Sequence, residues 1–285
     1  LCNQNDFVVI GGGNFFELCW DYSKTGTTID IGVDMLKKIE VPILFNGLGV
    51  DDGKGTNSQN IEKFRKFLMF LLEEDKYLLS VRNDGSMKIL EKYFSDTNLD
   101  KIFLIPDCGF FIQSGNFKHV EIDGDKINIG INLAGDMPNV RFGEKYSEFC
   151  IRFGDYLNYI LDSNEMINIV FLPHMYRDTE IISKVISNIK DEFRRSRISI
   201  APLLNASLNG CNYIFSLYKQ LDLILGMRFH SNVCAIGQNI PSIGLITYHK
   251  HGYLFDEIKL SDRALDVSDD CFFDNLRIKT IQDLN

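Results

Sequence analysis

Basic and ionisable side chains directly follow three hydrophobic runs of this sequence. Arg82 ends the run YLLSVR, and Lys250 comes shortly after PSIGLIT. Arg228 and His230 follow LDLILG. Arginine and lysine are cations that bind phosphate and carboxylate groups, and histidine exchanges protons near neutral pH. The pattern predicts a site for an anionic ligand that also gains or loses a proton.

Some of these residues also have a purely structural interpretation. Arg82 could pair with Asp84 in an ion pair that serves stability alone. Asp107 follows another hydrophobic run and would orient a cation or cap a turn. Asn83 or Asp84 is expected to cap the helix after Arg82, and Ser231 the helix after Arg228. Both interpretations stay open at this level.

Other histidines lie in similar positions. His174 follows the run INIVFLP, where a substrate contact and a structural role in a loop are equally open. His249 and His251 are two residues apart in a predicted loop without a cluster of carboxylates beside them. Such a pair is weak support for a metal, so no metal site is predicted.

A glycine cluster follows the first hydrophobic run in VVIGGGNFFE. Phe16 stands where the dinucleotide-binding pattern GxGxxG requires its third glycine, so this loop is not a convincing nucleotide site. Gly12 and Gly13 are instead expected to let the backbone turn tightly. Asn14 and Glu17 then present polar side chains beside this turn.

Hydrophobic runs alternate with amphipathic stretches along the chain. The runs predict strands at 8–10, 43–45, 77–81, 102–105, 127–133, 167–172, 198–201, 221–225 and 242–247. The stretches predict helices at 28–39, 59–72, 85–93, 146–163, 179–191, 213–220 and 231–236. Because the strands are uniformly apolar, we expect parallel sheets covered on both faces. The fold class predicted is α/β, with two Rossmann-like domains, 1–120 and 121–285, facing a central cleft.

Composition limits the partners. The 285 residues carry a formal charge of −9, which argues against nucleic acid and requires a few placed cations for any anionic ligand. Seven cysteines without a CxxC pair predict reduced, mostly buried thiols in a cytoplasmic protein. No apolar run is long enough for a membrane span. The chain has no initiator methionine and reaches its first strand at once, so we expect that an N-terminal segment is missing.

Four segments resemble the polysaccharide pyruvyl transferase family: VVIGGGNFFE, LLSVRNDGS, IPDCGF and GMRFHSNVCAIGQNIPSIGLITYHKHGYLF. The resemblance covers residues 6–258, and the last segment is the most specific. Two positions depart from the family pattern, since Asn83 stands where Asp is common and Phe229 where Leu is usual. The first strand of the family and its Asn-x-Gly-Asp-like turn are missing.

The resemblance implies a GT-B-like architecture and a reaction. Phosphoenolpyruvate would donate its pyruvyl group to sugar hydroxyls of a polysaccharide or its precursor, forming a ketal. His230 would be the general acid/base, while Arg82, Arg228 and Lys250 would bind the phosphate and carboxylate of phosphoenolpyruvate. His174 would be a further substrate contact. No cofactor besides this donor is expected.

The resemblance also implies partners and a division of labour. The acceptor would be a sugar or a lipid-linked oligosaccharide, met by Gly12, Gly13, Asn14 and Glu17 on the 1–120 side, with the donor on the 121–285 side. The protein would be cytoplasmic, with peripheral association at the inner membrane face as an alternative. Two other functions stay open: a nucleotide-sugar-dependent GT-B glycosyltransferase, and a non-catalytic glycan-binding relative.

Overall fold

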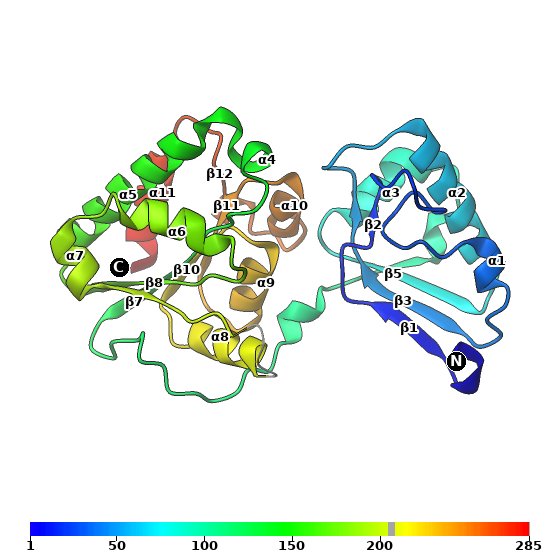
Figure 1. The fold of residues 1–285 in the computed structure, drawn as a ribbon, viewed down its shortest axis with the longest axis horizontal. Helices are drawn as coiled ribbons and strands as arrows, with labels where there is room; N and C mark the ends of the chain where they lie inside the picture. The colour runs from blue at the N-terminus through cyan, green and yellow to red at the C-terminus, as the bar shows by residue number, and fades with distance from the viewer. Residues whose placement is uncertain (205–208, 285) are drawn as a thin grey trace. The chain divides into compact units, whose positions relative to one another are not determined.

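The computed structural model describes residues 1–204 and 209–284, which form two compact units. Unit 1 comprises Leu1–Cys108 and Asp256–Ile258, and unit 2 comprises Gly109–Phe255 and Lys259–Asn285. In Figure 1 the blue and cyan elements up to α3 belong to unit 1, and most green, yellow and red elements to unit 2. The chain thus leaves unit 1 at Cys108, earlier than the predicted boundary at residue 120.

Unit 1 is built on a parallel four-stranded sheet in the order β1-β3-β5-β6. Its strands are β1 (Val8–Gly11), β3 (Ile43–Leu48), β5 (Tyr77–Arg82) and β6 (Ile102–Ile105). The helices of this unit are α1 (Val33–Leu36), α2 (Ser58–Glu73) and α3 (Ser86–Phe94). Every crossover steps in the same direction along the sheet, and right-handed crossovers then place their helices on one face. Figure 1 shows α2 and α3 on the same side of the sheet.

The other face of this sheet is exposed. Val9, Leu78 and Phe103 are 51%, 53% and 59% exposed, respectively. The expectation that both faces are covered is therefore wrong for unit 1 within the described residues. The cause is topological, because covering the second face requires crossovers in the opposite direction, as in a doubly wound sheet.

The helix predicted over 28–39 is much shorter in the structure, where α1 spans only Val33–Leu36. The residues before it form a loop in which the hydroxyls of Ser23 and Thr25 lie 3.1 Å apart and those of Thr25 and Thr27 2.8 Å apart. Side-chain hydroxyls that bond locally compete with helix formation. The hydroxyl of Thr25 also donates to the carbonyl oxygen of Ile29, so the first residues of the stretch predicted as a helix belong to this loop.

The helix α2 contributes more buried side chains to the core of unit 1 than any other helix of the unit does. Its side chains Phe64, Phe67, Leu68 and Leu71 are buried at helical spacing, as predicted. The helix starts because the side chain of Asn57 accepts the backbone N–H of Asn60 at 2.8 Å. Burying each of these large side chains contributes about 1.5–3 kcal/mol. The packing holds the sheet, and with it the strand ends that carry Arg82 and the glycine loop.

Unit 2 is built on a six-stranded parallel sheet in the order β12-β11-β10-β7-β8-β9. Its strands are β7 (Ile127–Asn132), β8 (Ile167–Phe171), β9 (Ile198–Ile200), β10 (Leu223–Gly226), β11 (Ser242–Ile246) and β12 (Ala264–Asp266). Its helices are α4 (Pro138–Phe142), α5 (Tyr146–Ser163), α6 (Asp178–Ile186), α7 (Asp191–Ser196), α8 (Gly210–Tyr218), α9 (Phe229–Gly237), α10 (His249–Glu257, which ends in unit 1) and α11 (Phe272–Leu284). The inner strands β8, β10 and β11 are buried at every residue, so the prediction of two covered faces is confirmed here.

Short elements complete the described chain. They are the two-residue strands β2 (Phe16–Glu17) and β4 (Val50–Asp51) and the 3-10 helices η1 (Cys2–Gln4), η2 (Leu99–Lys101), η3 (Cys108–Phe111), η4 (Gly143–Lys145) and η5 (Ser261–Arg263). Of the helices in the described ranges, none is both long enough and apolar enough to cross a bilayer. All seven cysteines are free thiols, but only Cys150 and Cys234 are buried, so the expectation of mostly buried thiols is wrong.

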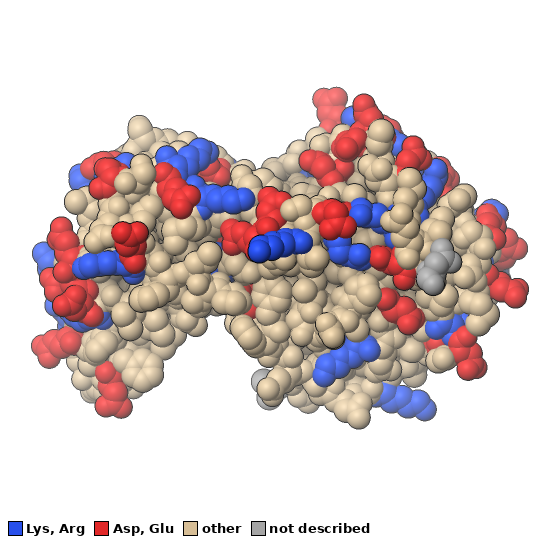
Figure 2. Space-filling view, turned by 180° about the vertical axis from the view of Figure 1, so that it is seen from behind, with Lys and Arg blue, Asp and Glu red and all other residues tan. Residues whose placement is uncertain are grey.

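Charges of both signs are interspersed on the visible surface, with large uncharged areas between them (Figure 2). On the face drawn in Figure 2, Lys and Arg side chains alternate with Asp and Glu side chains. A ligand with several negative charges is therefore not attracted by a broad basic field on that face. Local groups have to bind it.

Candidate functional site

The ionisable residues of unit 2 gather where its strands end. From β7 the chain winds outward through β8 and β9, and from β10 it winds outward through β11 and β12 on the other side. The crossovers after β7 and β10 therefore run in opposite directions. Because β7 and β10 are neighbours, their carboxyl ends form a topological switch point, the place where such sheets bind ligands.

Arg228 lies at this switch point, as the N-cap residue of α9. Its backbone is held by Asn132, the last residue of β7, whose Oδ1 accepts the N–H of Arg228 at 3.0 Å. The Nδ2 of Asn132 donates to the carbonyl oxygen of Leu172, just beyond β8, at 2.7 Å. The buried amide of Asn132 thus links the ends of β7, β8 and β10. It also fixes the backbone position of Arg228.

The guanidinium of Arg228 is held by the buried carboxylate of Asp178. Nε donates to Oδ2 at 2.9 Å, and Nη2 donates to Oδ1. Asp178 also accepts backbone N–H groups from Gly135 at 3.1 Å, His174 at 2.9 Å and Met175 at 3.0 Å. Burial raises the pKa of Asp178, but the hydrogen bonds and charge of Arg228 outweigh burial, so the pKa is lowered overall. Asp178 is an ionised anchor for Arg228.

A second carboxylate, Asp136, bridges two guanidinium groups. Nη2 of Arg228 donates to Asp136 Oδ1 at 2.7 Å, and Nη2 of Arg141 donates to Asp136 Oδ2 at 3.2 Å. Arg141 also donates to the hydroxyl of Thr247, after β11, at 3.0 Å. Burial raises the pKa of Asp136, and the charges of Arg141 and Arg228 more than offset this and lower it. Together with Asp178, two cations face two anions, so the formal charges in this cluster cancel.

Two histidines beside the cluster are held neutral. Burial, with the charges of Arg228 and His230, lowers the pKa of His174 to about 4, and its Nε2 lies 2.8 Å from the hydroxyl of Tyr218. Burial also lowers the pKa of His251 to about 3, assisted by the charges of Arg141 and Lys250. Neither histidine carries a charge at neutral pH, so neither adds to the binding of an anion as a cation.

Lys250 and His230 complete the residues predicted in this half. Lys250 is buried in the first turn of α10, and His230 is exposed in the first turn of α9. The charge of Lys250 lowers the pKa of His251, and the charge of His230 lowers the pKa of His174. Both residues therefore lie beside the cluster. The structure thus brings Arg228, His230, Lys250 and His174 to one region of unit 2.

A cavity of about 490 Å³ borders this region. It is formed by residues of α4 and α5 and of the loop after β12, and Arg141 is one of its lining residues. The volume is within the usual range for small-molecule sites. Because Arg141 also binds Asp136, the ion cluster adjoins space that a small ligand can enter.

In unit 1, Arg82 lies at the end of β5 and is buried between carboxylates. Its Nε donates to Asp84 Oδ2 at 2.6 Å and its Nη1 to Asp107 Oδ2 at 3.1 Å. The ion pair with Asp84 that was the structural alternative is therefore present, and Asp107 orients the cation. The helix after it begins at Gly85 as N-cap without a side-chain cap, and Asp84 accepts the N–H of Ser86 instead.

The glycine loop of unit 1 is part of a small second sheet. Strands β2 and β4 pair in parallel, and the N–H of Gly49 donates to the carbonyl oxygen of Gly13 at 3.0 Å. Gly12 has a φ of 82°, a left-handed conformation that favours glycine. The predicted tight turn is present, and its partner is the second glycine-rich segment of the chain.

Asn14 and Glu17 take part in a hydrogen-bond network within this loop. Asn14 donates to Asp51 at 2.7 Å and to Glu17 at 3.1 Å. Glu17 also accepts from Lys54 at 2.7 Å and from the indole N–H of Trp20 at 3.2 Å. A sugar hydroxyl that bound here would have to join this network or replace one of its members.

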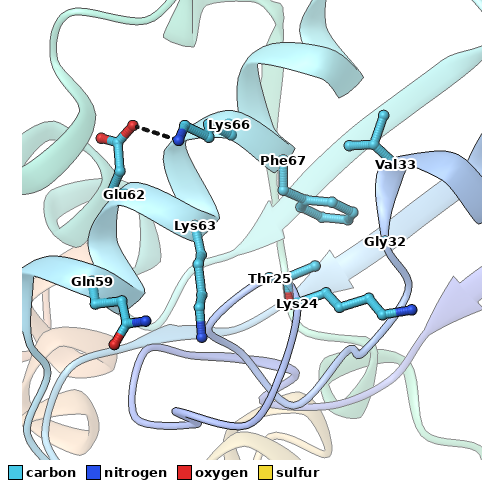
Figure 3. A pocket seen from close by; sticks show the side chains of 9 residues that line it. All are labelled: Lys24, Thr25, Gly32, Val33, Gln59, Glu62, Lys63, Lys66 and Phe67. Carbon is cyan, nitrogen blue, oxygen red and sulfur yellow. Dashed lines mark ion pairs between the residues drawn. The ribbon is translucent and has the colours of Figure 1, made fainter.

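A second hollow of unit 1, of about 280 Å³, lies between α2 and the loop before α1 (Figure 3). Lys24, Lys63 and Lys66 line it, and in Figure 3 their ammonium groups point to different sides. Lys66 pairs with Glu62 at 3.4 Å, and Lys63 donates to the carbonyl oxygen of Asp21 at 2.6 Å. Three cations that diverge, two of which already have partners, do not form a site for one anion.

The sequence reasoning missed several residues of the cluster in unit 2. Asp136 and Arg141 follow β7 in the segment LAGDMPNVR, and a search of every strand end for charges of either sign would have included them. The role of Asn132 gave no comparable signal, because it is an uncharged residue within the strand predicted at 127–133. Ser231 does not cap α9 as predicted, since the N-cap is Arg228 and Ser231 Oγ donates to its carbonyl oxygen at 2.7 Å.

Solved structures with a similar fold include a sugar-nucleotide epimerase and a complex with UDP. A putative UDP-N-acetylglucosamine 2-epimerase from Listeria monocytogenes matches 99% of this chain with a TM-score of 0.59 and 12% identity. The S. aureus MnaA–UDP structure matches 99% with a TM-score of 0.57 and 12% identity. The chain spans 66% of the length of each. At this identity the likeness shows the fold alone, and it confirms the predicted α/β class with Rossmann-like domains of the GT-B kind.

Sequence comparison identifies the family. A search of curated proteins gives no significant match to the chain. The family model for polysaccharide pyruvyl transferase matches residues 2–250, which is most of the chain. The matched range includes Arg82, Arg228, His230 and Lys250, on which the resemblance was based. The chain belongs to the polysaccharide pyruvyl transferase family.

Proposed function

We propose that this protein transfers the pyruvyl group of phosphoenolpyruvate to two hydroxyls of a sugar. The reaction needs a proton at C3 of the donor, which makes C2 electrophilic. One hydroxyl adds to C2, and a second hydroxyl replaces the phosphate. The products are a cyclic pyruvate ketal and inorganic phosphate, and the two protons lost by the hydroxyls balance the proton gained at C3 and the one taken up by phosphate.

The observation that carries the proposal is the set of residues at the switch point of unit 2, in a chain of this family. Phosphoenolpyruvate carries a phosphate and a carboxylate, and Arg228 and Lys250 are the cations that we assign to them. Asp178 presents Arg228 in a fixed orientation, which lowers the entropic cost of binding. Arg82 stays a predicted contact from unit 1.

We assign the proton transfer to His230. It is exposed beside the cluster, whereas burial lowers the pKa of His174 to about 4 and that of His251 to about 3. A general acid works best with a pKa near the working pH, so the two buried histidines are poor candidates. His174 then serves as a neutral contact that the hydroxyl of Tyr218 orients.

The test is the release of inorganic phosphate from phosphoenolpyruvate with a panel of sugar acceptors, with the ketal methyl signal followed by NMR. His230→Ala should lower turnover by about 10²–10⁴-fold, the usual contribution of a general acid. The matched control is His174→Gln, which should keep turnover within about tenfold because no proton transfer is lost. Near-wild-type turnover of His230→Ala with a working acceptor would disprove the assignment.

The runner-up is a nucleotide-sugar-dependent glycosyltransferase. The observation in its favour is the fold, shared with the UDP-bound MnaA structure of S. aureus. In the same assay this alternative predicts UDP release from a nucleotide sugar and no phosphate release from phosphoenolpyruvate. The two activities therefore separate in one experiment.

A further inference from the structure

Two carboxylates contact Arg228, and they differ in burial and in the groups that hold them. The side chain of Asp178 is fully buried and accepts three backbone N–H groups, from Gly135, His174 and Met175. The side chain of Asp136 is 17% exposed. Its carboxylate is held by the guanidinium groups of two arginines and by its own backbone N–H. Asp178 is built into the fold, whereas Asp136 is bound mainly by charge.

The position of Asp136 resembles that of a bound anion. A carboxylate between Nη2 of Arg228, at 2.7 Å, and Nη2 of Arg141, at 3.2 Å, has the contacts that a ligand carboxylate or phosphate would have. Arg141 is also one of the residues that line the cavity of about 490 Å³, so one member of this pair adjoins space that a small ligand can enter. Asp178 already occupies Nε and Nη2 of Arg228. A ligand that uses both arginines therefore competes with Asp136.

The segment that carries Asp136 has an energetically unfavourable backbone conformation at the next residue. The next residue, Met137, has a φ of 50° and a ψ of 50°, a left-handed conformation that is unfavourable for a side chain of this type. Pro138 follows as the first residue of α4. Release of Asp136 from the arginines would allow Met137 to leave this conformation, which partly offsets the loss of the ion pairs.

We propose that Asp136 is an internal competitor that sets the specificity of the anion site. An incoming anion has to replace the Asp136 carboxylate between Arg228 and Arg141. A ligand with one carboxylate only replaces the contacts that Asp136 makes, whereas a ligand with a phosphate and a carboxylate has a second anionic group that can also replace the existing partner of a further cation, such as Lys250. Asp136 thereby selects ligands with two anionic groups over monoanions. The choice of phosphoenolpyruvate as the doubly anionic probe rests on the proposed function.

The test compares Asp136→Asn with Asp178→Asn, which remove the same charge from the same arginine. Calorimetry would measure binding of phosphoenolpyruvate, pyruvate and inorganic phosphate to the wild-type chain and both variants. Asp136→Asn should bind phosphoenolpyruvate about tenfold more tightly, which is about 1.4 kcal/mol. The affinity of this variant for pyruvate should rise by a larger factor, so that the ratio of its affinities for phosphoenolpyruvate and pyruvate falls. Asp178→Asn should bind all three anions more weakly, because Arg228 loses its anchor.

The outcomes separate this inference from the proposed function. Weaker or unchanged anion binding by Asp136→Asn would overturn the inference, because the carboxylate would then be positioning Arg228. Tighter binding of phosphate and pyruvate by Asp136→Asn, with no binding of phosphoenolpyruvate to any form, would support the inference and contradict the proposed function. If Asp136→Asn does not fold, as judged by circular dichroism, Asp136→Ser replaces it under the same criteria.

Discussion

At the scale of single residues, the site depends on which groups burial keeps neutral. His174 and His251 lie beside Arg228 and Arg141, and burial is the largest cause of their low pKa values. A charged imidazole at either position would repel the guanidinium groups. Two of the histidines near the cluster are therefore neutral at neutral pH, and the exposed His230 is the residue to which we propose to assign proton transfer.

The low pKa of His251 predicts how stability depends on pH. In the unfolded chain its pKa is about 6.5, and in the folded chain it is about 3. The unfolded state therefore takes up a proton at pH 5 that the folded state refuses, so stability is lost as the pH falls below about 6.5. For one group this loss is about 2 kcal/mol between pH 7 and pH 5.

The measurement is urea unfolding of the wild type and of His251→Gln at both pH values. The variant keeps a polar side chain but does not titrate. The wild type should therefore lose about 2 kcal/mol more of its free energy of unfolding on acidification than the variant does. An equal loss in both proteins would show that His251 is protonated in the folded state.

Residue types at strand ends could be read from the sequence, but their partners could not. Arg228 and His230 were selected because they follow a hydrophobic run. The carboxylates that hold Arg228 are 50 and 92 residues away in the chain. Only the strand order, in which β10 lies beside β7, brings them together. The sequence therefore overestimated the free positive charge of the cluster.

At the scale of elements, the loop between β7 and α4 has to pass very close to the start of α6. A Cβ atom added to Gly135 would lie 1.9 Å from the carbonyl oxygen of Arg177. This approach is what allows the N–H of Gly135 to reach Asp178 at 3.1 Å. A larger residue at this position would push the two loops apart and move the carboxylate that holds Arg228.

Gly135→Ala is therefore expected to destabilise the fold by about 3 kcal/mol, in the range of severe backbone and packing changes. The matched control is Gly124→Ala, in a loop of the same unit, where an added Cβ meets nothing within 4 Å. Chemical denaturation of both variants checks this. A loss below about 0.5 kcal/mol in Gly135→Ala would mean that the loops separate at little cost.

Most helices and strands were predictable because the spacing of apolar residues differs between buried strands and amphipathic helices. The strand predicted at 242–247 is β11 (Ser242–Ile246), and the helix predicted at 146–163 is α5 (Tyr146–Ser163). The helix predicted at 28–39 is present only as α1 (Val33–Leu36), because the residues before it belong to a loop in which the hydroxyl of Thr25 donates to the carbonyl oxygen of Ile29. Elements with short or mixed patterns, such as β12 and α11, were not predicted at all.

At the scale of the whole molecule, the negative net charge has to be reconciled with the anionic donor that we propose. A formal charge of −9 opposes the approach of a multiply charged anion. Under the proposed function, binding would therefore depend on a few oriented cations at the switch point of unit 2 and not on the field of the protein. The net charge argues against nucleic acid as the main partner, but composition alone could not name the donor.

The central claim is that phosphoenolpyruvate is the donor. Thermal unfolding of the chain with phosphoenolpyruvate and with a panel of nucleotide sugars tests it most directly. A ligand at a hundredfold its dissociation constant adds about 2.7 kcal/mol of stability, which raises the melting temperature measurably. We predict such a shift with phosphoenolpyruvate and none with nucleotide sugars. A shift with a nucleotide sugar and none with phosphoenolpyruvate would contradict the account.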